Sequence, residues 1–315
     1  MKVLVTGGAG FIGANLCQRL ALDPAIDRVV AYDNLSTGDL ANLDGCSDVR
    51  VVVADICDPA ALAEAMHGAQ AVVHLAALPS VPRSIEDPVA SHVSNTTGTL
   101  EVLEAARRAG DVHVVVASSS SVYGSSPELP KHERLKPSPV SPYAATKLAA
   151  ETYTLAWGAT FDMRVLAFRF FNVFGPLQPA GHAYAAVLPA FISAAIEGRA
   201  LPIHGDGEQS RDFTYVGSAC EVIHDALRRG VTHPEPVNLA FGSRTTLLEV
   251  VEILESIFER SLEREHLPPR LGDVRHSMAD QTRLRSLFPG LSPLSLEQGI
   301  RATVDWFATL PRPGI

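Results

Sequence analysis

Residues 2–13, KVLVTGGAGFIG, constrain the fold of this chain more than any other stretch. The apolar residues 3–5 are long enough for one buried strand, and residues 11–20 suit a helix. The glycines that join them are Gly7, Gly8, Gly10 and Gly13. A strand that enters a helix through glycines leaves bare backbone N–H groups at the helix N-terminus, which favours an anion such as a pyrophosphate.

An acidic residue follows the glycines at the spacing expected for a dinucleotide site. Asp33 ends the next strand-like run, residues 28–32. A carboxylate there accepts hydrogen bonds from both hydroxyls of an adenosine ribose and repels a 2′-phosphate. The pattern therefore predicts a dinucleotide site and favours NAD over NADP. The alternative is a glycine-rich strand-to-helix turn without a ligand.

The same alternation of strand and helix continues through the first half of the chain. The strand-like runs cover residues 28–32, 49–54, 71–75, 111–117 and 165–170, and the helix-like runs cover residues 11–20, 87–109 and 143–157. Strands that are apolar on both faces predict a parallel sheet covered by helices on both sides. The expected fold is α/β, a doubly wound sheet that binds its ligand at the carboxyl ends of the strands.

Composition argues against a nucleic-acid-binding protein, a metal site and a membrane protein. The 315 residues, 46% of them hydrophobic, allow one large domain or two smaller ones, and the formal net charge of −9 gives a nucleic-acid role no electrostatic support. The cysteines have no metal-like spacing, so we expect reduced thiols and no metal. The sequence begins directly with the first strand and has no apolar run of membrane-spanning length, so we expect a cytoplasmic protein without a signal peptide.

Polar residues gather after the strand at residues 111–117. Four serines, residues 118–121, follow it directly, and Tyr143 and Lys147 lie further on at the start of a helix. A spacing of four residues places both side chains on one helical face. The alternatives are a serine-rich loop that caps its own backbone and an ordinary amphipathic helix.

Together, the TGGAGFIG loop, the serines around Ser119 and the Tyr143-x-x-x-Lys147 pair resemble the extended short-chain dehydrogenase/reductase superfamily. Within it, the chain is similar to the NAD-dependent sugar-nucleotide epimerases and dehydratases of the UDP-glucose/UDP-N-acetylglucosamine 4-epimerase type. The likeness covers nearly the whole chain. Each motif alone is common, but the three in this order and spacing are specific.

The resemblance implies a division of the chain. A Rossmann domain that binds NAD is expected over residues 1–171, with residues 216–240 returning to it. A smaller lobe for the UDP-sugar is expected mainly from residues 172–215 and 241–315. It also implies a homodimer, in which the helices at residues 87–109 and 143–157 pair into a four-helix interface.

The resemblance further implies a catalytic set of Ser119, Tyr143 and Lys147. A tyrosine with a pKa near 10 is a poor base at neutral pH. The ammonium of Lys147 and the positive charge of an oxidised nicotinamide would lower the pKa of Tyr143. Ser119 would steady the proton between the sugar hydroxyl and the phenol, and Lys147 would also bind the nicotinamide ribose.

Contacts to the cofactor and the substrate are implied residue by residue. The cofactor residues are Gly7, Gly10, Phe11, Ile12, Gly13, Asp33, Asn34, Ser36, Asp55, Ile56, Leu75, Ala76, Ala77, Asn95, Ser118, Tyr143, Lys147 and Phe170. The substrate residues are Ser80, Val81, Ser119, Ser120, Ser121, Tyr143, Asn172, Ala186, Val187, Arg211, Arg270, Asp273 and Ser277. Arginines from two loops clamp a diphosphate with directed hydrogen bonds, which is the role expected of Arg211 and Arg270.

Two positions bear on the reaction and the sugar. The dehydratases of the family place an Asp-Glu pair directly after the residue equivalent to Ser119, whereas this chain has Ser120 and Ser121. The sequence therefore favours a UDP-hexose 4-epimerase; a dehydratase that retains NAD and a non-catalytic dinucleotide sensor stay as alternatives. Ser277 stands where a tyrosine restricts the site to plain hexoses, so a pocket for an N-acetyl group is expected. Leu177 stands where uronic-acid epimerases carry an arginine.

Overall fold

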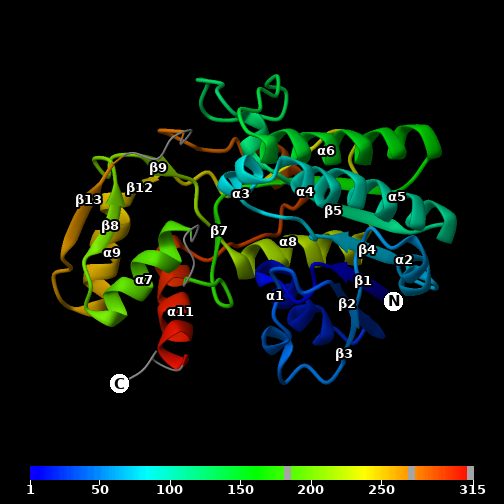
Figure 1. The fold of residues 1–315 in the computed structure, drawn as a ribbon, viewed down its shortest axis with the longest axis horizontal. Coiled ribbons are helices and arrows are strands. Elements are labelled where there is room, and N and C mark those ends of the chain that lie inside the picture. Colours follow the sequence, from blue (N-terminus) through cyan, green and yellow to red (C-terminus); the bar gives the residue numbers. More distant parts are fainter. Residues whose placement is uncertain (181–185, 269–273, 311–315) are drawn as a thin grey trace.

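The computed structural model describes residues 1–180, 186–268 and 274–310. A large sheet with helices on both faces occupies one side of the molecule, and a smaller lobe occupies the other (Figure 1). In the described residues the large sheet has seven strands, all paired in parallel, in the order β11-β6-β5-β4-β1-β2-β3. Its strands are β1 (Lys2–Thr6), β2 (Arg28–Asp33), β3 (Val49–Val53), β4 (Ala71–His74), β5 (His113–Ser119), β6 (Val165–Phe170) and β11 (Val237–Leu239).

This strand order confirms the predicted doubly wound α/β fold. From β1 the chain builds outwards through β2 and β3, and it then crosses back to build β4, β5 and β6 on the other side. The order therefore reverses between β1 and β4, and a crevice at their carboxyl ends is the usual ligand site of such a sheet. The last residues of these two strands, Thr6 and His74, are direct partners in the register.

Helices cover both faces of the large sheet. The helices and short helical turns of the described residues, in both parts of the molecule, are α1 (Phe11–Ala21), η1 (Leu40–Leu43), α2 (Pro59–Met66), α3 (Val81–Glu86), α4 (Pro88–His92), η2 (Val93–Thr97), α5 (Gly98–Ala109), η3 (Ser120–Tyr123), α6 (Pro142–Phe161), α7 (Val187–Glu197), α8 (Val216–Arg229), α9 (Leu247–Phe258), α10 (Thr282–Leu287) and α11 (Leu296–Thr309). Helices α1 and α8 lie on one face, and α2, α5 and α6 lie on the other (Figure 1).

The alternation of side chains along β1 explains this layering. Val3 and Val5 belong to the apolar core under α1 and α8, whereas Leu4, between them, belongs to the core under α2 and α5. Successive side chains of a strand point to opposite faces, so a strand that is apolar at every position must be covered twice. All three side chains are fully buried.

Strand β3 corrects one prediction, because the run at residues 49–54 was expected to be a buried strand. In the structure β3 is the edge strand of the sheet, and it pairs only with β2 in the described residues. Val51 is 38% exposed and Val53 is 58% exposed. The apolar run alone does not distinguish an edge strand from a central one, because position in the sheet depends on the rest of the chain.

The helix predicted at residues 87–109 is interrupted. It consists of α4, the π-helical turn η2 and α5, and Asn95 lies in the middle of the π turn. A π turn holds one more residue than an α turn, and such turns occur frequently at functional sites. The helix predicted from Tyr143 begins one residue earlier and extends four residues further than expected, as α6.

The smaller lobe contains short paired strands around a separate core. Its strands are β7 (Val173–Phe174), β8 (Leu201–His204), β9 (Ser210–Arg211), β10 (Thr214–Tyr215), β12 (Thr245–Thr246) and β13 (Arg264–Leu267). Helices α7, α9 and α11 pack around this core, which includes Phe191, Val251 and Ile300. Strand β11 and helix α8, which follow β10 in the chain, lie in the large sheet and against α1.

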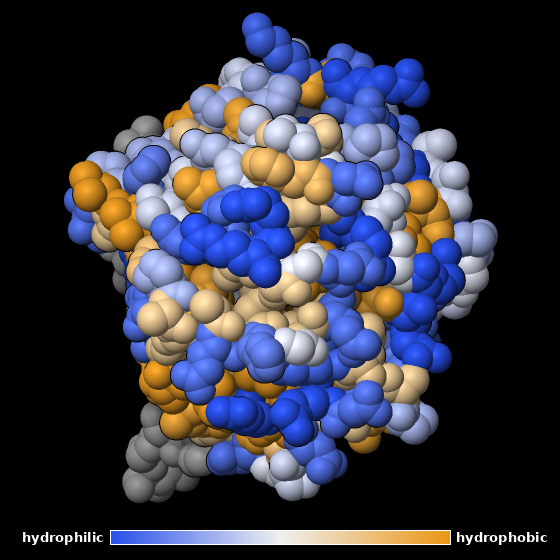
Figure 2. Space-filling view, turned by 90° about the vertical axis from the view of Figure 1, so that its right-hand side faces the viewer, coloured by the Kyte–Doolittle hydropathy of each residue, from blue (hydrophilic) through white to orange (hydrophobic). Residues whose placement is uncertain are grey.

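Hydrophilic and hydrophobic residues are interspersed on the face that Figure 2 shows, the right-hand side of Figure 1. Among the helices of the described residues, none is long and apolar enough to cross a membrane.

Candidate active site

The glycine loop after β1 leaves no room for side chains at Gly7, Gly8 and Gly13. Gly7 has a φ of +69°, and a Cβ there would lie 2.7 Å from the backbone nitrogen of Ala76. A Cβ at Gly13 would lie 2.0 Å from the carbonyl oxygen of Gly7. The N-terminus of α1 has no side-chain cap, so its first N–H groups are available to an anion. This geometry fits the pyrophosphate of a dinucleotide.

Asp33 lies at the end of β2, beside the glycine loop. One carboxylate oxygen accepts a hydrogen bond from the amide of Ala9 at 3.0 Å, and the other accepts from the amide of Leu35 at 2.8 Å. Each oxygen keeps a further lone pair, so the carboxylate is oriented and still able to accept from a ribose. Asn34 donates to Asp55 at 2.7 Å, which joins the loops after β2 and β3. The residues present therefore fit the adenosine half of NAD.

The predicted catalytic residues come from two elements. Ser119 is the last residue of β5, and Tyr143 and Lys147 lie in the first turns of α6. Ser121 donates to the Ser119 oxygen from its amide at 3.2 Å and from its hydroxyl at 2.9 Å. Ser119 also lowers the pKa of the Tyr143 phenol, so the two hydroxyl groups lie near each other. The structure thus brings Ser119, Ser121 and Tyr143 together at one edge of the sheet.

The protein alone sets the pKa of Tyr143 by burial, whereas the lowering expected from the resemblance includes the charge of an oxidised nicotinamide. Burial raises the pKa of this phenol, and the hydrogen bond from Ser119 opposes that effect only in part. Lys147 is not among the causes, although its own pKa is lowered by burial to about 8. Burial disfavours the charged form of each group.

The start of α6 is held by two serines that the sequence prediction missed. Ser141 caps the helix by accepting from the amide of Ala144 at 3.1 Å. Ser84, from α3, accepts from the amide of Tyr143 at 3.0 Å and is fully buried. The first amides of a helix have no partner within it, so Ser84 fixes the backbone at the catalytic tyrosine.

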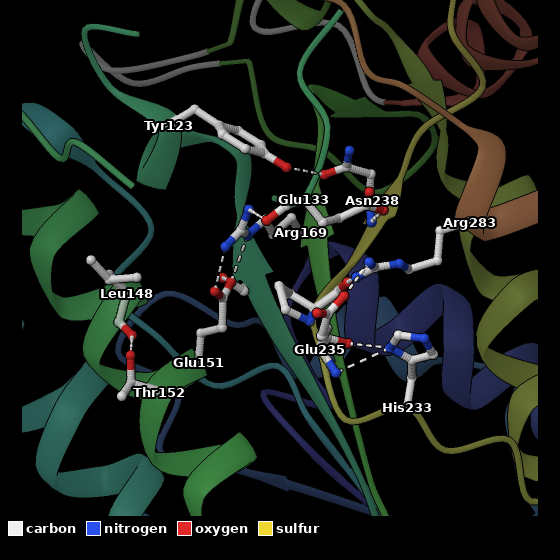
Figure 3. Close-up of polar contacts among 12 residues, drawn as sticks. Tyr123, Glu133, Leu148, Glu151, Thr152, Arg169, His233, Glu235, Asn238 and Arg283 are labelled. Carbon is white, nitrogen blue, oxygen red and sulfur yellow. Dashed lines mark hydrogen bonds and ion pairs between the residues drawn. The ribbon is translucent and has the colours of Figure 1, made fainter. Parts of the chain in front are cut away.

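A buried ion pair joins α6 to the sheet (Figure 3). The guanidinium of Arg169, in β6, donates to both carboxylate oxygens of Glu151, at 2.7 and 2.9 Å. The hydroxyl of Ser118 donates to the same carboxylate at 2.6 Å. Glu151 lies one turn after Lys147, so the pair holds the catalytic helix against β5 and β6. Ser118, predicted to contact the cofactor, has its side chain directed to Glu151.

The same guanidinium supports the far end of the serine turn η3. It lies over the ring of Tyr123, 4.7 Å from the ring centroid, and the Tyr123 hydroxyl donates to Asn238 at 2.6 Å (Figure 3). Ser119 and Ser120 thus lie between two residues, Ser118 and Tyr123, that both contact the ion pair. The sequence prediction missed the contacts of Arg169 with Glu151 and Tyr123. The feature that could have revealed them is a single arginine in the otherwise apolar strand β6.

The substrate side is built around Asp212. Its buried carboxylate accepts from the amides of Gly242 at 3.1 Å and Ala279 at 3.0 Å, and from the hydroxyl of Ser243 at 3.2 Å. Burial raises its pKa to about 6, against the effect of these hydrogen bonds. Three segments of the smaller lobe are therefore joined at one side chain.

This arrangement brings predicted substrate residues together. Asn172 donates to the carbonyl of Asp212 at 3.2 Å, and Arg211 precedes Asp212 in the chain. The amide of Ser277 donates to the carbonyl of Ser210 at 3.0 Å. Asn172, Arg211 and Ser277 thus lie around one loop.

Charges of both signs lie around this loop, because Arg275 is ion-paired with Asp206 at 2.8 Å. Burial lowers the pKa of His276, and the nearby charges of Arg244, Arg275 and Arg211 lower it further. The guanidinium of Arg244 donates to the hydroxyl of Ser210 at 3.2 Å, which places a second arginine beside Arg211. Arg270 and Asp273, the other predicted partners of the nucleotide, lie outside the described residues.

The remaining predicted residues lie at the ends of elements. Ser80 caps α3 and Val81 begins it, and Ala186 precedes α7, which Val187 begins. Phe170 is the register partner of Ser119. The residues that directly follow β3 or β4 are Asp55, Ile56, Leu75, Ala76 and Ala77. Their contacts to ligands remain predictions.

The fold and the site define a dinucleotide-binding α/β protein with a serine–tyrosine–lysine set. A sequence profile of the NAD dependent epimerase/dehydratase family matches residues 3–240. The chain belongs to this family, which confirms the predicted family and its NAD cofactor.

Similar proteins fall into two groups of activity. The chain is 37% identical over 316 residues to a UDP-glucose 4-epimerase of Mycolicibacterium smegmatis, covering 98% of each chain. It is 34% identical over 334 residues to a dTDP-glucose 4,6-dehydratase of Xanthomonas campestris, covering 97% of this chain and 93% of the other. A solved UDP-N-acetylglucosamine 4-epimerase of Methanobrevibacter ruminantium, in complex with UDP-N-acetylmuramic acid, superposes with a TM-score of 0.91 at 35% identity, covering 98% of each chain.

Replacing Tyr143 by Phe is expected to abolish turnover without releasing NAD. The ring still packs, but the hydroxyl that takes the proton is gone, and loss of such a group typically costs about 10²–10⁴-fold in rate. Turnover of a sugar nucleotide and the NAD content of the purified protein measure the two effects. Tyr153→Phe, on the exposed face of the same helix, is the matched control. A near-native rate for Tyr143→Phe would show that another residue is the base.

Replacing Glu151 by Gln is expected to cost about 3–5 kcal/mol of unfolding free energy, because the guanidinium of Arg169 stays buried without its counter-charge. Urea denaturation measures the loss. The double replacement Glu151→Met with Arg169→Met is expected to regain most of it. Asp225→Asn, in an exposed pair with Arg229 on α8, is the control and should cost less than about 1 kcal/mol. Equal losses from Glu151→Gln and Asp225→Asn would contradict the role of the buried pair.

Proposed function

We propose that this protein is a UDP-hexose 4-epimerase that acts on UDP-N-acetylglucosamine, UDP-glucose or both. The observation that carries the proposal is the combination of Ser119, Tyr143 and Lys147 with serines, rather than an acidic pair, at positions 120 and 121. We assign NAD binding to residues 1–171 with residues 216–240, and sugar binding mainly to residues 172–215 and 241–315.

In the proposed reaction the phenolate of Tyr143, stabilised by the ammonium of Lys147 and by the charge that an oxidised nicotinamide would supply, removes the proton of the sugar C4 hydroxyl. Ser119 hydrogen-bonds the same oxygen. Bound NAD would accept the hydride of C4 and later return it to the opposite face of the sugar. Between these steps the 4-keto sugar rotates within the site, so that its opposite face meets the cofactor. Tyr143 then gives its proton back to the C4 oxygen. Lys147 holds positive charge beside the site throughout. No atom is gained or lost, as an epimerisation requires.

Dehydration is the alternative within the family. Elimination of water needs an acid and a base beside the sugar. In this chain the hydroxyl of Ser121 is hydrogen-bonded to Ser119, and the nearby carboxylate of Glu151 is held by Ser118 and Arg169. A non-catalytic dinucleotide sensor is a further alternative, and the complete set of Ser119, Tyr143 and Lys147 counts against it.

The UDP-sugar assignment rests on the loop around Arg211. Arg211 and the neighbouring Arg244 offer guanidinium groups to a diphosphate, and Asn172 lies beside the same loop. The relative from Methanobrevibacter ruminantium is a UDP-N-acetylglucosamine 4-epimerase, which supports a UDP-N-acetylhexosamine as a substrate. Ser277 is small and only partly buried, so it leaves space for an acetamido group and offers that amide a hydroxyl.

Product analysis tests the reaction and the sugar together. NMR of the mixtures after incubation with UDP-N-acetylglucosamine and, separately, UDP-glucose is expected to show the C4 epimer. A 4-keto-6-deoxy sugar would instead establish dehydration, and no product from any sugar nucleotide would favour the sensor.

Replacing Ser277 by Tyr is expected to lower kcat/KM for UDP-N-acetylglucosamine by about 10-fold or more while sparing UDP-glucose, because the ring fills the space of the acetamido group. Steady-state kinetics with both substrates measure the ratio. Ser286→Tyr, at an exposed position of α10, is the control. An equal loss on both sugars would contradict the pocket assignment.

We also propose a homodimer through the outer face of α4, η2 and α6. Apolar side chains are exposed there, with Val89 70%, Val93 44% and Phe161 45% accessible. Tyr153 stacks edge-on against Trp157 with ring centroids 5.6 Å apart, so the aromatic surface is rigid. A second copy would cover these side chains and gain from their burial.

Light scattering at micromolar concentration is expected to give the mass of two chains. Tyr153→Glu places a charge in the proposed interface and is expected to shift the mass to one chain. Leu22→Glu, an exposed apolar residue at the end of α1, should leave it unchanged. A monomeric wild type would refute the dimer.

A further inference from the structure

His74 is a buried titratable residue that the proposed mechanism does not use. It is the last residue of β4, at the point where the strand order reverses, and it is 3% exposed. Its Nδ1 lies 2.7 Å from the hydroxyl of Thr6, at the end of β1, and its Nε2 lies 2.9 Å from the hydroxyl of Thr99, in α5. The ring therefore joins the strand that leads into the glycine loop to a helix on the opposite side of the site.

The neighbouring hydrogen bonds determine the tautomer of His74. The hydroxyl of Thr99 donates to the carbonyl of Asn95 at 2.6 Å, so towards His74 it can only accept. Nε2 must then carry the proton, and Nδ1 must accept from the hydroxyl of Thr6. That hydroxyl in turn accepts from the amide of Ala76 at 3.4 Å. Burial and the nearby charge of Lys147 lower the pKa of His74 to about 3, which agrees with a neutral ring.

The chain of hydrogen bonds continues to the catalytic helix. Asn95, in the π turn η2, donates from its side chain to the hydroxyl of Thr146 at 3.1 Å, and that hydroxyl donates to the carbonyl of Tyr143 at 2.8 Å. The Asn95 side chain also accepts from the amide of Leu78 at 2.7 Å and donates to its carbonyl at 3.3 Å. The side-chain amide of Asn95 thus hydrogen-bonds the loop after β4 and the helix α6, and it holds the two together.

We propose that His74 is a positioning residue, whose Nε2-protonated ring sets the distance between the dinucleotide loop and Tyr143 through Thr99 and Asn95. The inference rests on the proposed function only in its first step, oxidation at C4, which epimerases and dehydratases share. Each link is directional, so each can be broken separately. A displacement of about 1 Å in a catalytic group costs up to about 10²-fold in rate, which makes such a link measurable.

Two replacements of His74 test its hydrogen bonds to Thr6 and to Thr99 separately. The side chain of Asn reaches the position of Nδ1 and can accept from Thr6, but it loses the donor to Thr99. The side chain of Gln reaches the position of Nε2 and can donate to Thr99, but it loses the acceptor for Thr6. His74→Asn is expected to lower kcat about 10- to 100-fold. His74→Gln is expected to rescue most of that loss and to bind NAD more weakly.

Two comparisons distinguish positioning from a structural role. The KM for the sugar nucleotide should change little in either variant, because the smaller lobe is untouched. Thr99→Val should lower kcat as His74→Asn does, and the double variant should lower it no further, because both remove the same link. His113→Gln, a buried histidine at the other end of the sheet, should leave kcat unchanged. Losses that follow melting temperature in every variant, or additive losses in the double variant, would overturn the proposal.

One readout needs no turnover. The ¹⁵N chemical shifts of the His74 ring in the purified protein are expected to show a neutral Nε2–H tautomer from pH 5 to pH 8. This whole range lies above the pKa of about 3, so the ring carries no charge. An Nδ1–H tautomer, or a ring that takes up a proton near pH 6, would overturn the proposal even if the protein turned over no UDP-sugar. A wild type without turnover and with the expected tautomer would refute only the proposed function.

Discussion

The parallel pairing of β1 with both β2 and β4 is the constraint on which the rest of the structure depends. Because all three strands run in the same direction, their carboxyl ends meet at one edge, and the glycine loop must open there. Asp33 is placed by β2, and His74 by β4. The serine turn after β5 opens at the same edge, because β5 is parallel to β4.

Buried polar contacts hold the site edge in addition to the apolar cluster that contains Val122 and Phe171. The Glu151–Arg169 pair joins α6 to β5 and β6, and the Asp212 carboxylate joins three segments of the smaller lobe. Apolar contacts are non-directional, whereas hydrogen bonds fix angles as well as distances. A reaction that moves a proton and a hydride between fixed atoms requires that kind of constraint.

The sequence predicted those features that depend on neighbouring residues. The glycine loop, the strand-to-helix alternation and the spacing of Tyr143 and Lys147 are local patterns, and the fold and family followed from them. The Glu151–Arg169 pair and the contact of Ser84 with Tyr143 join residues 18 and 59 positions apart, so no local pattern contains them. The exposure of β3 depends on its place in the sheet. The raised pKa of Tyr143 depends on burial, which spacing does not reveal.

The π turn at Asn95 makes the helix between β4 and β5 intolerant of changes in length. Each residue of a helix advances the chain by about 100°, and the additional residue in η2 rotates α5 by that amount relative to α4. Deleting one residue there would restore a regular helix, but it would turn Asn95 out of the site or Val102 and Leu103 out of the core. The rotational positions of Asn95 in the site and of Val102 and Leu103 in the core are therefore coupled along this helix. A change in helix length that preserves one displaces the other.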